Sequence, residues 1–435
     1  MRVLVYLYFP PLRSHLPGGA QQFARDLLQG FARQGVEMEI LCPEAAGQPL
    51  LDLGPDVAIA PVLVEESDRP LTPYERLWNA RAYCERGAGA DVVLSFDRGV
   101  PAELDVPVVQ SLNNFTYATQ VEAVFGLAWD ELVVPSSYLA DCVAAVVGPQ
   151  AWTGSPPPIH TVPYGVDTAH YRPRDPRELQ ARLGLDPTRR FLLCPHRPDP
   201  AKGVAAALAA VALAVRSDPR LQLLIPQPPQ SVAAVRDTEA RFIAEVREQV
   251  TALGLADHVT FHPWISVEDM PAYYSLGTAC LALGTFPETF GFTPVQAIAC
   301  GTPGVAAPAG AVPTLLPPGH GLQLVPFDDA AAVASALTNL PAATALAAGR
   351  EFIATAYSPD AAVRGYLSVL RGAARRTGQY RPGGGDLVMP PWCRLLPDGR
   401  RWHDYEGTVA GADAAPATPG EMQRRGFAVP RFGLF

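Results

Sequence analysis

The chain has 435 residues, a length that is typical of about two α/β domains rather than of one core. Hydrophobic residues make up 48% of it, but no uninterrupted apolar run reaches the roughly 18 residues that a membrane-spanning helix needs. The net charge of −9 is concentrated in residues 1–165, which hold 9 arginines against 19 acidic residues. This excess disfavours binding of nucleic acid or anionic lipid by the first half, and it suits a cationic ligand.

Strand-like and helix-like runs alternate along the chain, which predicts parallel α/β domains. In the first half we expect helices near residues 20–34, 73–86 and 136–146. Strands are expected near residues 2–8, 36–42, 57–64, 91–96, 106–112 and 131–135. The helix-breaking segment at residues 154–158 and the turn at residues 164–167 predict that a first domain covers residues 1–165.

The second half repeats the pattern, which predicts a second α/β domain over residues 166–357. Strands are expected near residues 190–195, 221–225, 257–262, 278–283, 303–306 and 322–325. Helices are expected near residues 204–215, 234–253, 329–339, 342–356 and 358–374. Residues 358–435 would form a crossover helix and a Pro- and Gly-rich tail, whose Trp392, Trp402 and Tyr405 predict that it packs on the body.

The cysteines and histidines do not predict a metal site. The seven cysteines are scattered, which disfavours a disulfide framework and a zinc cluster. His258 and His262 would lie too far apart on a strand to share one ion. Residues 2–9 are followed by Pro10-Pro11 and show no cleavage signal, so we expect a first strand and a cytoplasmic protein.

The cation composition singles out Lys202, the one lysine beside 33 arginines. It stands five residues after Arg197, between an apolar strand and an alanine-rich helix. Lysine is a compact point charge and arginine is a planar fork, so the two differ physically. Cations on a strand-to-helix loop lie at the strand ends of an α/β sheet, where phosphates commonly dock. The alternative is a solvated surface pair.

A second specific segment runs from Phe286 to Pro303. It follows an apolar strand, contains Gly291 in a loop, and enters a helix with Pro294 in its first turn. The start of that helix offers free backbone N–H groups and a positive dipole end to an anion. Glu288 is placed to accept hydrogen bonds from hydroxyl groups. The alternative is an ordinary strand–loop–helix packing unit.

These two segments resemble the family 4 glycosyltransferases, together with Gly18-Gly19 before the first helix and the turn Tyr164-Gly165-Val166-Asp167. The resemblance covers about residues 1–372. It implies the GT-B fold, in which two Rossmann-like domains with parallel sheets face each other and a C-terminal helix crosses back. It also implies transfer of a sugar from a nucleotide donor with retention of the anomeric configuration.

The resemblance assigns roles to individual residues. Arg197 and Lys202 would hold the donor diphosphate, and Glu288 would bind donor-sugar hydroxyls. Backbone N–H groups around Phe290, Gly291 and Phe292 would meet the sugar or phosphate, and Gly18 and Gly19 would approach the diphosphate from the other domain, where glycine lets the backbone come close. The alternative for the two glycines is a simple turn.

Two positions depart from the family pattern. Gln296 stands where the family has a second glutamate that grips the ribose, so the hydrogen bond there loses the strengthening of a charged acceptor. Asn113 stands where the family usually has a histidine near the donor sugar. It can form a hydrogen bond but cannot carry a proton. The alternative for Asn113 is a turn that ends a strand.

The motifs supply one well-placed glutamate, not the carboxylate pair of a double-displacement enzyme. The resemblance favours front-face departure, in which the leaving phosphate accepts the acceptor's proton, with no metal and no cofactor beyond a UDP- or GDP-linked sugar. The acidic first half predicts a small, amino-bearing acceptor such as an aminocyclitol or amino sugar, with Asp97, Glu122 and Asp130 as candidate contacts.

Three other functions share this architecture. A pyridoxal-dependent phosphorylase would need Lys202 for its Schiff base, which conflicts with the role given above. A nucleotide-sugar epimerase stays open, and so does a catalytically impaired nucleotide-sugar-binding homologue, which Gln296 and Asn113 favour. The residues do not indicate an oligomeric state.

Overall fold

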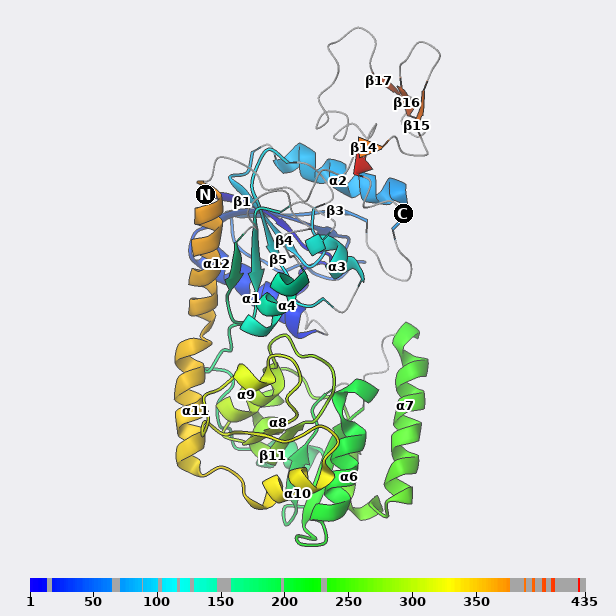
Figure 1. The fold of residues 1–435 in the computed structure, drawn as a ribbon, viewed down its shortest axis with the longest axis vertical. Helices are drawn as coiled ribbons and strands as arrows, with labels where there is room; N and C mark the ends of the chain where they lie inside the picture. Colours follow the sequence, from blue (N-terminus) through cyan, green and yellow to red (C-terminus); the bar gives the residue numbers. More distant parts are fainter. Residues whose placement is uncertain are drawn as a thin grey trace. The chain divides into compact units, whose positions relative to one another are not determined.

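The computed structural model describes residues 1–13, 18–64, 71–87, 89–100, 104–115, 118–125, 129–146, 158–196, 199–227 and 233–375, and the backbone of five short strands beyond residue 386. The chain divides into two units (Figure 1). The first comprises Met1–Val162 and Ala362–Phe435, and the second comprises Pro163–Ala361. The sequence places the first boundary three residues later and joins residues 358–361 to the last segment.

The first unit is built on a seven-stranded sheet in which every pair of neighbours is parallel. Its strands are β1 (Arg2–Tyr6), β2 (Glu37–Pro43), β3 (Val57–Leu63), β4 (Val92–Phe96), β5 (Val108–Ser111), β6 (Glu131–Val134) and β7 (Ile159–Thr161). The spatial order is β3-β2-β1-β4-β5-β6-β7, so the direction of winding reverses between β1 and β4. In such sheets, ligands bind outside the carboxyl ends of the strands at this switch point.

Helices cover both faces of the first sheet. Those of this unit are α1 (Gly19–Arg33), α2 (Pro73–Gly87), α3 (Ala118–Phe125), α4 (Ser137–Val146) and α12 (Pro359–Ala373), which enters the unit at Ala362. α1 and α12 pack together: the ring centroids of Phe23 in α1 and Tyr366 in α12 lie 5.8 Å apart. On the other face, Tyr83 of α2, Val124 of α3 and Leu139 of α4 join one buried cluster.

The second unit repeats the design with six parallel strands. These are β8 (Arg190–Leu193), β9 (Leu221–Pro226), β10 (Val259–His262), β11 (Gly277–Ala282), β12 (Gly304–Ala306) and β13 (Leu322–Leu324). Their order, β10-β9-β8-β11-β12-β13, is the Rossmann order, with its switch point between β8 and β11. The inner strands β9, β8, β11 and β12 are mostly apolar because both faces of a parallel sheet are covered there.

Two sets of helices cover the second sheet. α6 (Val204–Ala214), α7 (Ala233–Ala252) and α10 (Ala330–Thr338) form one cluster with it. α5 (Arg177–Arg182), α8 (Met270–Leu276) and α9 (Phe292–Ala299) form the other, and α11 (Ala343–Ala356) packs on α9 at Gly349 and Ile298. α3, α5, α8 and the strand β7 are additions to the predicted elements.

Two details qualify the sequence interpretation. His258 ends the 3₁₀ turn Ala256–His258 and does not lie on β10, where the sequence places it. The side chains of residues 376–435 lie outside the described residues, so the packing expected for Trp392, Trp402 and Tyr405 stays a prediction.

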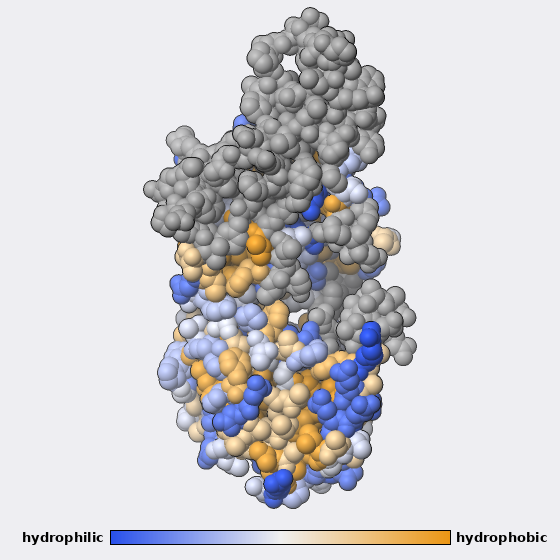
Figure 2. Space-filling model, turned by 45° about the vertical axis from the view of Figure 1, so that its right-hand side comes forward, coloured by the Kyte–Doolittle hydropathy of each residue, from blue (hydrophilic) through white to orange (hydrophobic). Residues whose placement is uncertain are grey.

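The surface of the second unit mixes hydrophilic and hydrophobic residues on the face seen in Figure 2, and its large exposed hydrophobic residues in the described ranges are Leu253, Trp264, Leu324 and Phe327. No single described helix has the length and apolarity to cross a membrane. By length and composition alone, Ala330–Thr338 together with Ala343–Ala373 passes that test as a pair bent by 105°.

Candidate functional site

Lys202 and Glu288 meet at the switch point of the second sheet. Lys202 follows β8 and Glu288 follows β11, the two strands between which the order reverses. The Lys202 Nζ lies 2.7 Å from Glu288 Oε1 and 4.3 Å from the centroid of the Phe286 ring. The two side chains are 23% and 31% exposed, so a ligand can reach the pair from solvent.

The loop that carries Lys202 is held by a close backbone contact. A Cβ on Gly203, whose φ is +81°, would lie 2.4 Å from the carbonyl carbon of Leu283, and a Cβ on Gly284 would lie 2.4 Å from the Ala201 oxygen. That oxygen accepts hydrogen bonds from the backbone N–H groups of residues 285 and 286, at 3.0 and 3.2 Å. Only glycine allows the two loops this approach, so Gly203 and Gly284 place Lys202 beside Glu288.

A third loop, which follows β12, fixes Glu288 from the other side. The Ala311 N–H donates to the Glu288 carbonyl oxygen at 2.7 Å. A Cβ on Gly310 would lie only 2.2 Å from the same oxygen. The glutamate is therefore positioned by backbone contacts at both the β11 and β12 ends.

The start of α9 is an uncapped helix terminus next to Glu288. Gly291 occupies the N-cap position with φ of 104° and supplies no side-chain hydrogen bond. Within the described residues, the backbone N–H groups of Gly291, Phe292 and Thr293 have no acceptor. They are the groups that an anion at a helix N-terminus binds.

Aromatic packing anchors this helix start. The Tyr164 ring stacks on Phe292 with centroids 5.2 Å apart and planes 10° from parallel, and Phe290 packs between Tyr164 and Tyr357. The Val166 N–H donates to the Tyr357 oxygen at 2.7 Å, which holds the turn at residues 164–167. The side chains of Phe290 and Phe292 thus have a structural role, and a ligand at this place would contact backbone N–H groups.

Gln296, in the second turn of α9, is already hydrogen-bonded. The hydroxyl of the buried Tyr274 donates to Gln296 Oε1 at 3.2 Å. An amide oxygen has a second lone pair and the amide nitrogen has two N–H groups, so the side chain keeps the capacity to bind a hydroxyl.

His196 is a member of the site that sequence reasoning did not select. It follows β8, and its Nε2 is buried without a hydrogen-bond partner among the residues described. Burial first, and then the nearby Lys202 charge, lower the pKa of His196 to about 4, while Glu288 and a hydrogen bond to the Leu281 backbone act in the opposite direction. The ring is therefore neutral at pH 7. The sequence signal that could have identified His196 is its position, as a polar residue between the apolar strand β8 and Lys202.

The other predicted residues are distributed as follows. Arg197 lies outside the described residues. Gly18, Gly19 and Asn113 belong to the first unit. Gly18 is the N-cap of α1 with φ of −123°, and a Cβ there would meet only the flexible Gln21 side chain, so neither sterics nor backbone conformation requires glycine.

The acidic candidates of the first unit separate in the structure. Asp97 is 1% exposed and is bonded to Asn113, so it is a core residue. Asp130 precedes β6, and its Oδ2 accepts from the Val108 N–H at 2.7 Å, at the amino end of β5. That is the edge of the sheet opposite to the one where ligands bind. The Glu122 side chain lies outside the described residues.

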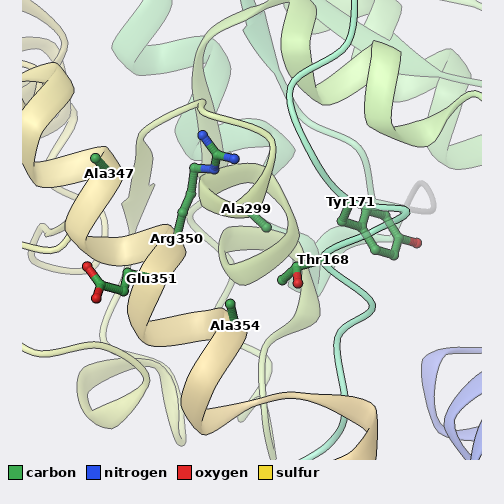
Figure 3. A pocket seen from close by; sticks show the side chains of 7 residues that line it. All are labelled: Thr168, Tyr171, Ala299, Ala347, Arg350, Glu351 and Ala354. Atoms are coloured by element: carbon green, nitrogen blue, oxygen red, sulfur yellow. The ribbon is translucent and has the colours of Figure 1, made fainter.

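A separate pocket of about 310 Å³ lies elsewhere in the second unit (Figure 3). Its lining comes from the segment after β7, the end of α9 and α11: Thr168, Tyr171, Ala299, Ala347, Arg350, Glu351 and Ala354. It contains none of the predicted site residues. No cluster of three or more metal-ligating side chains occurs in the part of the chain that the structure describes.

Comparisons with known proteins agree with this architecture. A family model described as Glycosyltransferase Family 4 matches residues 17–170, and one described as Glycosyl transferases group 1 matches residues 175–343. D-inositol 3-phosphate glycosyltransferase 1 of Catenulispora acidiphila is 30% identical over 402 residues, which cover 84% of this chain and 93% of that protein. The D-inositol 3-phosphate glycosyltransferase of Segniliparus rotundus is 33% identical over 166 residues, which cover 38% of this chain and 35% of that protein.

Solved structures show the same fold at low identity. Sucrose-phosphate synthase from Thermosynechococcus elongatus superposes with a TM-score of 0.67 at 18% identity, covering 85% of this chain and 98% of that one. Anabaena HepE, solved in complex with UDP-glucose, superposes with a TM-score of 0.64 at 17% identity, covering 86% and 100%.

Two parallel Rossmann-like sheets joined by a returning C-terminal helix make the GT-B fold. The two family models and the relative that the chain covers almost entirely show that this is a nucleotide-sugar glycosyltransferase. The chain belongs to glycosyltransferase family 4. The predicted fold class and the predicted family are confirmed.

Proposed function

We propose that this enzyme transfers a hexose from a nucleoside diphosphate donor to a hydroxyl group of a small-molecule acceptor, with retention of configuration. The observation that supports the proposal is the contact between Lys202 and Glu288 beside the uncapped start of α9. One side of this arrangement carries positive charge and N–H donors for a diphosphate. The other side carries a carboxylate for sugar hydroxyls.

In the proposed reaction, the bond between the anomeric carbon and the diphosphate oxygen breaks while a bond to the acceptor oxygen forms on the same face. The acceptor's proton passes to the leaving phosphate oxygen. Lys202, the start of α9 and, by family resemblance, Arg197 stabilise the negative charge that develops on that phosphate. When the diphosphate takes over Lys202, Glu288 is released from its ion pair and accepts hydrogen bonds from the sugar.

For the donor we propose a UDP-linked hexose, and UDP-glucose is the first to test because HepE was solved with it. Gln296 replaces a charged ribose acceptor, so we expect weaker nucleotide affinity than a glutamate at this position would give. The proposal predicts that Gln296→Glu tightens nucleotide binding.

For the acceptor we propose a cyclitol, because the relatives are named D-inositol 3-phosphate glycosyltransferases. Residues 1–165 carry ten more negative than positive charges, which favours an amino-bearing cyclitol over a phosphorylated one. A preference for phosphorylated or neutral acceptors that is insensitive to salt would exclude the amino-bearing class.

The test combines binding with turnover. Donors are screened by thermal stabilisation, since binding to the folded state raises the melting temperature. Lys202→Ala is then assayed for transfer with the best donor. We expect turnover to fall by about 10² or more, as for loss of a transition-state clamp. The matched control is Arg220→Ala, a cation paired with Asp218 at the amino end of β9, which should leave turnover unchanged.

Turnover of Lys202→Ala close to that of the parent would contradict the assignment. Two other outcomes correspond to other functions. Donor binding with neither transfer nor slow hydrolysis would indicate a binding homologue that has lost activity. Gln296 and Asn113, which depart from the family pattern, favour this alternative. A changed sugar without any acceptor would indicate an epimerase.

A further inference from the structure

The Phe286 ring is a second partner of Lys202 in the candidate site. The Lys202 Nζ lies 4.3 Å from the centroid of this ring and 2.7 Å from Glu288 Oε1. All three residues belong to the second unit, and Phe286 lies half-buried in the loop after β11. The ammonium group is therefore held between an aromatic face and a carboxylate.

The segment that carries both partners is short and stiff. Pro287 stands between Phe286 and Glu288, and its ring fixes its own φ and restricts the residue before it to extended conformations. The Phe286 N–H donates to the Ala201 carbonyl oxygen at 3.2 Å, which ties the segment to the residue before Lys202. The ring and the carboxylate thus reach one ammonium group from a single segment whose backbone is fixed.

An aromatic face and a carboxylate hold a cation in different ways. A carboxylate accepts hydrogen bonds from the ammonium group, so it competes with a phosphate for the same three N–H donors. An aromatic ring attracts the positive charge through its quadrupole, and this attraction does not require a particular N–H donor. The contact with Phe286 can therefore be kept while a diphosphate replaces Glu288 as the hydrogen-bond partner of Lys202.

We propose that Phe286 is a positioning residue of the transferase: its ring keeps the Lys202 ammonium group in place while the ion pair with Glu288 is exchanged for the donor diphosphate. The proposal rests on the proposed function, in which that exchange frees Glu288 for the sugar. Without the ring, the diphosphate itself would have to order the flexible lysine side chain, at a cost in side-chain entropy. Donor affinity and the stabilisation of the leaving phosphate should then both weaken.

The same geometry suits a lysine better than an arginine, in a chain whose other cationic residues are 33 arginines. The ammonium group is a compact point charge, so it can leave Glu288 for a phosphate with little rearrangement. An arginine at this position could stack on the Phe286 ring and bind the Glu288 carboxylate with two hydrogen bonds at once. That arrangement would hold the carboxylate away from the sugar. Lys202→Arg should therefore lower turnover by about tenfold or more.

The contact can be observed directly because Lys202 is the one lysine in the chain. In protein that contains isotopically labelled lysine, the ε-CH₂ group gives a single side-chain signal in the NMR spectrum. The face of an aromatic ring shields nearby protons, so we expect this signal upfield of that of free lysine. Phe286→Leu should move it downfield, and Phe286→Tyr should keep it upfield. A parental signal that the leucine change does not move would overturn the proposal.

The functional experiment measures UDP affinity and kcat/KM with the best donor for the parent, Phe286→Leu and Phe286→Tyr. A cation–π contact corresponds to about three- to thirtyfold in a binding constant, and the leucine variant should lose this factor in both quantities. The tyrosine variant keeps the aromatic face and should stay within about twofold of the parent. A leucine variant as active as the parent, or equal losses in the two variants, would overturn the proposal.

Two comparisons separate the positioning of Lys202 from a general effect on folding, which melting curves of all variants also monitor. In a Lys202→Ala background, Phe286→Leu should cause no further loss beyond about twofold, because the ring then has no cation to hold. Losses that multiply would contradict the positioning role. The matched control is Phe261→Leu in β10, which removes a ring whose centroid lies 4.1 Å from the Arg247 Cζ. This variant should keep the parental UDP affinity and turnover.

The readouts also keep this proposal apart from the proposed function. If the parent transfers no sugar, the proposed function fails, and the lysine signal still shows whether the ring holds the ammonium group. If transfer occurs and depends on Lys202 but not on Phe286, the positioning role alone is wrong.

Discussion

Gly284→Ala tests how the second unit builds its site. The new Cβ would lie 2.4 Å from the Ala201 oxygen and 2.9 Å from the Lys202 Cα. Both atoms belong to the backbone, so no side-chain rotation relieves the overlap. Because real Cβ contacts are essentially never shorter than 3.0 Å, one loop must move by at least about 0.6 Å, carrying Lys202 away from Glu288. A displacement of about 1 Å costs about 10² in rate, so we expect turnover to fall by about tenfold or more.

The assay is transfer from the best donor at saturating acceptor, together with a melting curve that shows the variant is folded. Gly372→Ala is the matched control, since the nearest atom to its Cβ is 4.0 Å away and it lies in α12. Replacing a helical glycine with alanine should raise stability by about 0.5–1 kcal/mol and leave turnover unchanged. A folded Gly284→Ala protein with turnover within about twofold of the parent would refute the reasoning.

Two further predictions concern stability. A Cβ on Gly30 would lie 2.3 Å from Val363 Cγ2, so Gly30→Ala should lower the free energy of unfolding by about 1–3 kcal/mol through overpacking. Adding Val363→Ala should recover part of this loss. If denaturant unfolding shows that the losses of the two variants simply add, the contact between α1 and α12 is contradicted. Burial lowers the pKa of His196 to about 4 in the folded protein, whereas an unfolded chain has the ordinary value of about 6.5. As the pH falls, the unfolded chain therefore takes up this proton first. The contribution of the neutral His196 to the free energy of unfolding is complete above pH 6.5, and about 3 kcal/mol of it is lost as the pH falls to 4. Denaturation of the parent and of His196→Gln at pH 4.5 and 7.5 measures this, and equal losses of stability for the two proteins would count against it.

Most of the fold could be predicted because buried parallel strands are short continuous apolar runs and long helices show their periodicity. All six strands expected in each half form, within a few residues of the predicted bounds. α3, α5 and α8 were missed because they have eight, six and seven residues. A helix of about two turns gives too little periodic signal to be separated from a loop.

The site was only partly predictable, for a different reason. Lys202 and Glu288 could be paired from the sequence because both follow strands of one sheet, and carboxyl ends of parallel strands meet at one edge. The close backbone approach of Gly203 and Gly284 could not be predicted, because strand order places the two loops at one edge of the sheet but does not say how closely their backbones meet. Asp97 was grouped with Glu122 and Asp130 as a candidate acceptor contact, because its burial and its left-handed backbone follow from neighbours distant in sequence and cannot be seen in the sequence pattern.

The return of α12 to the first unit imposes an order on synthesis. Residues 1–162 leave the ribosome first, but the Tyr366 that packs on Phe23 and bonds Ser111 is translated some 200 residues later. At about 5–20 residues per second, the nascent first sheet waits roughly 10–40 s for its last covering helix. The second unit is continuous in sequence, so it can fold before α12 covers the first sheet. During this interval the uncovered face of the first sheet is accessible to molecular chaperones.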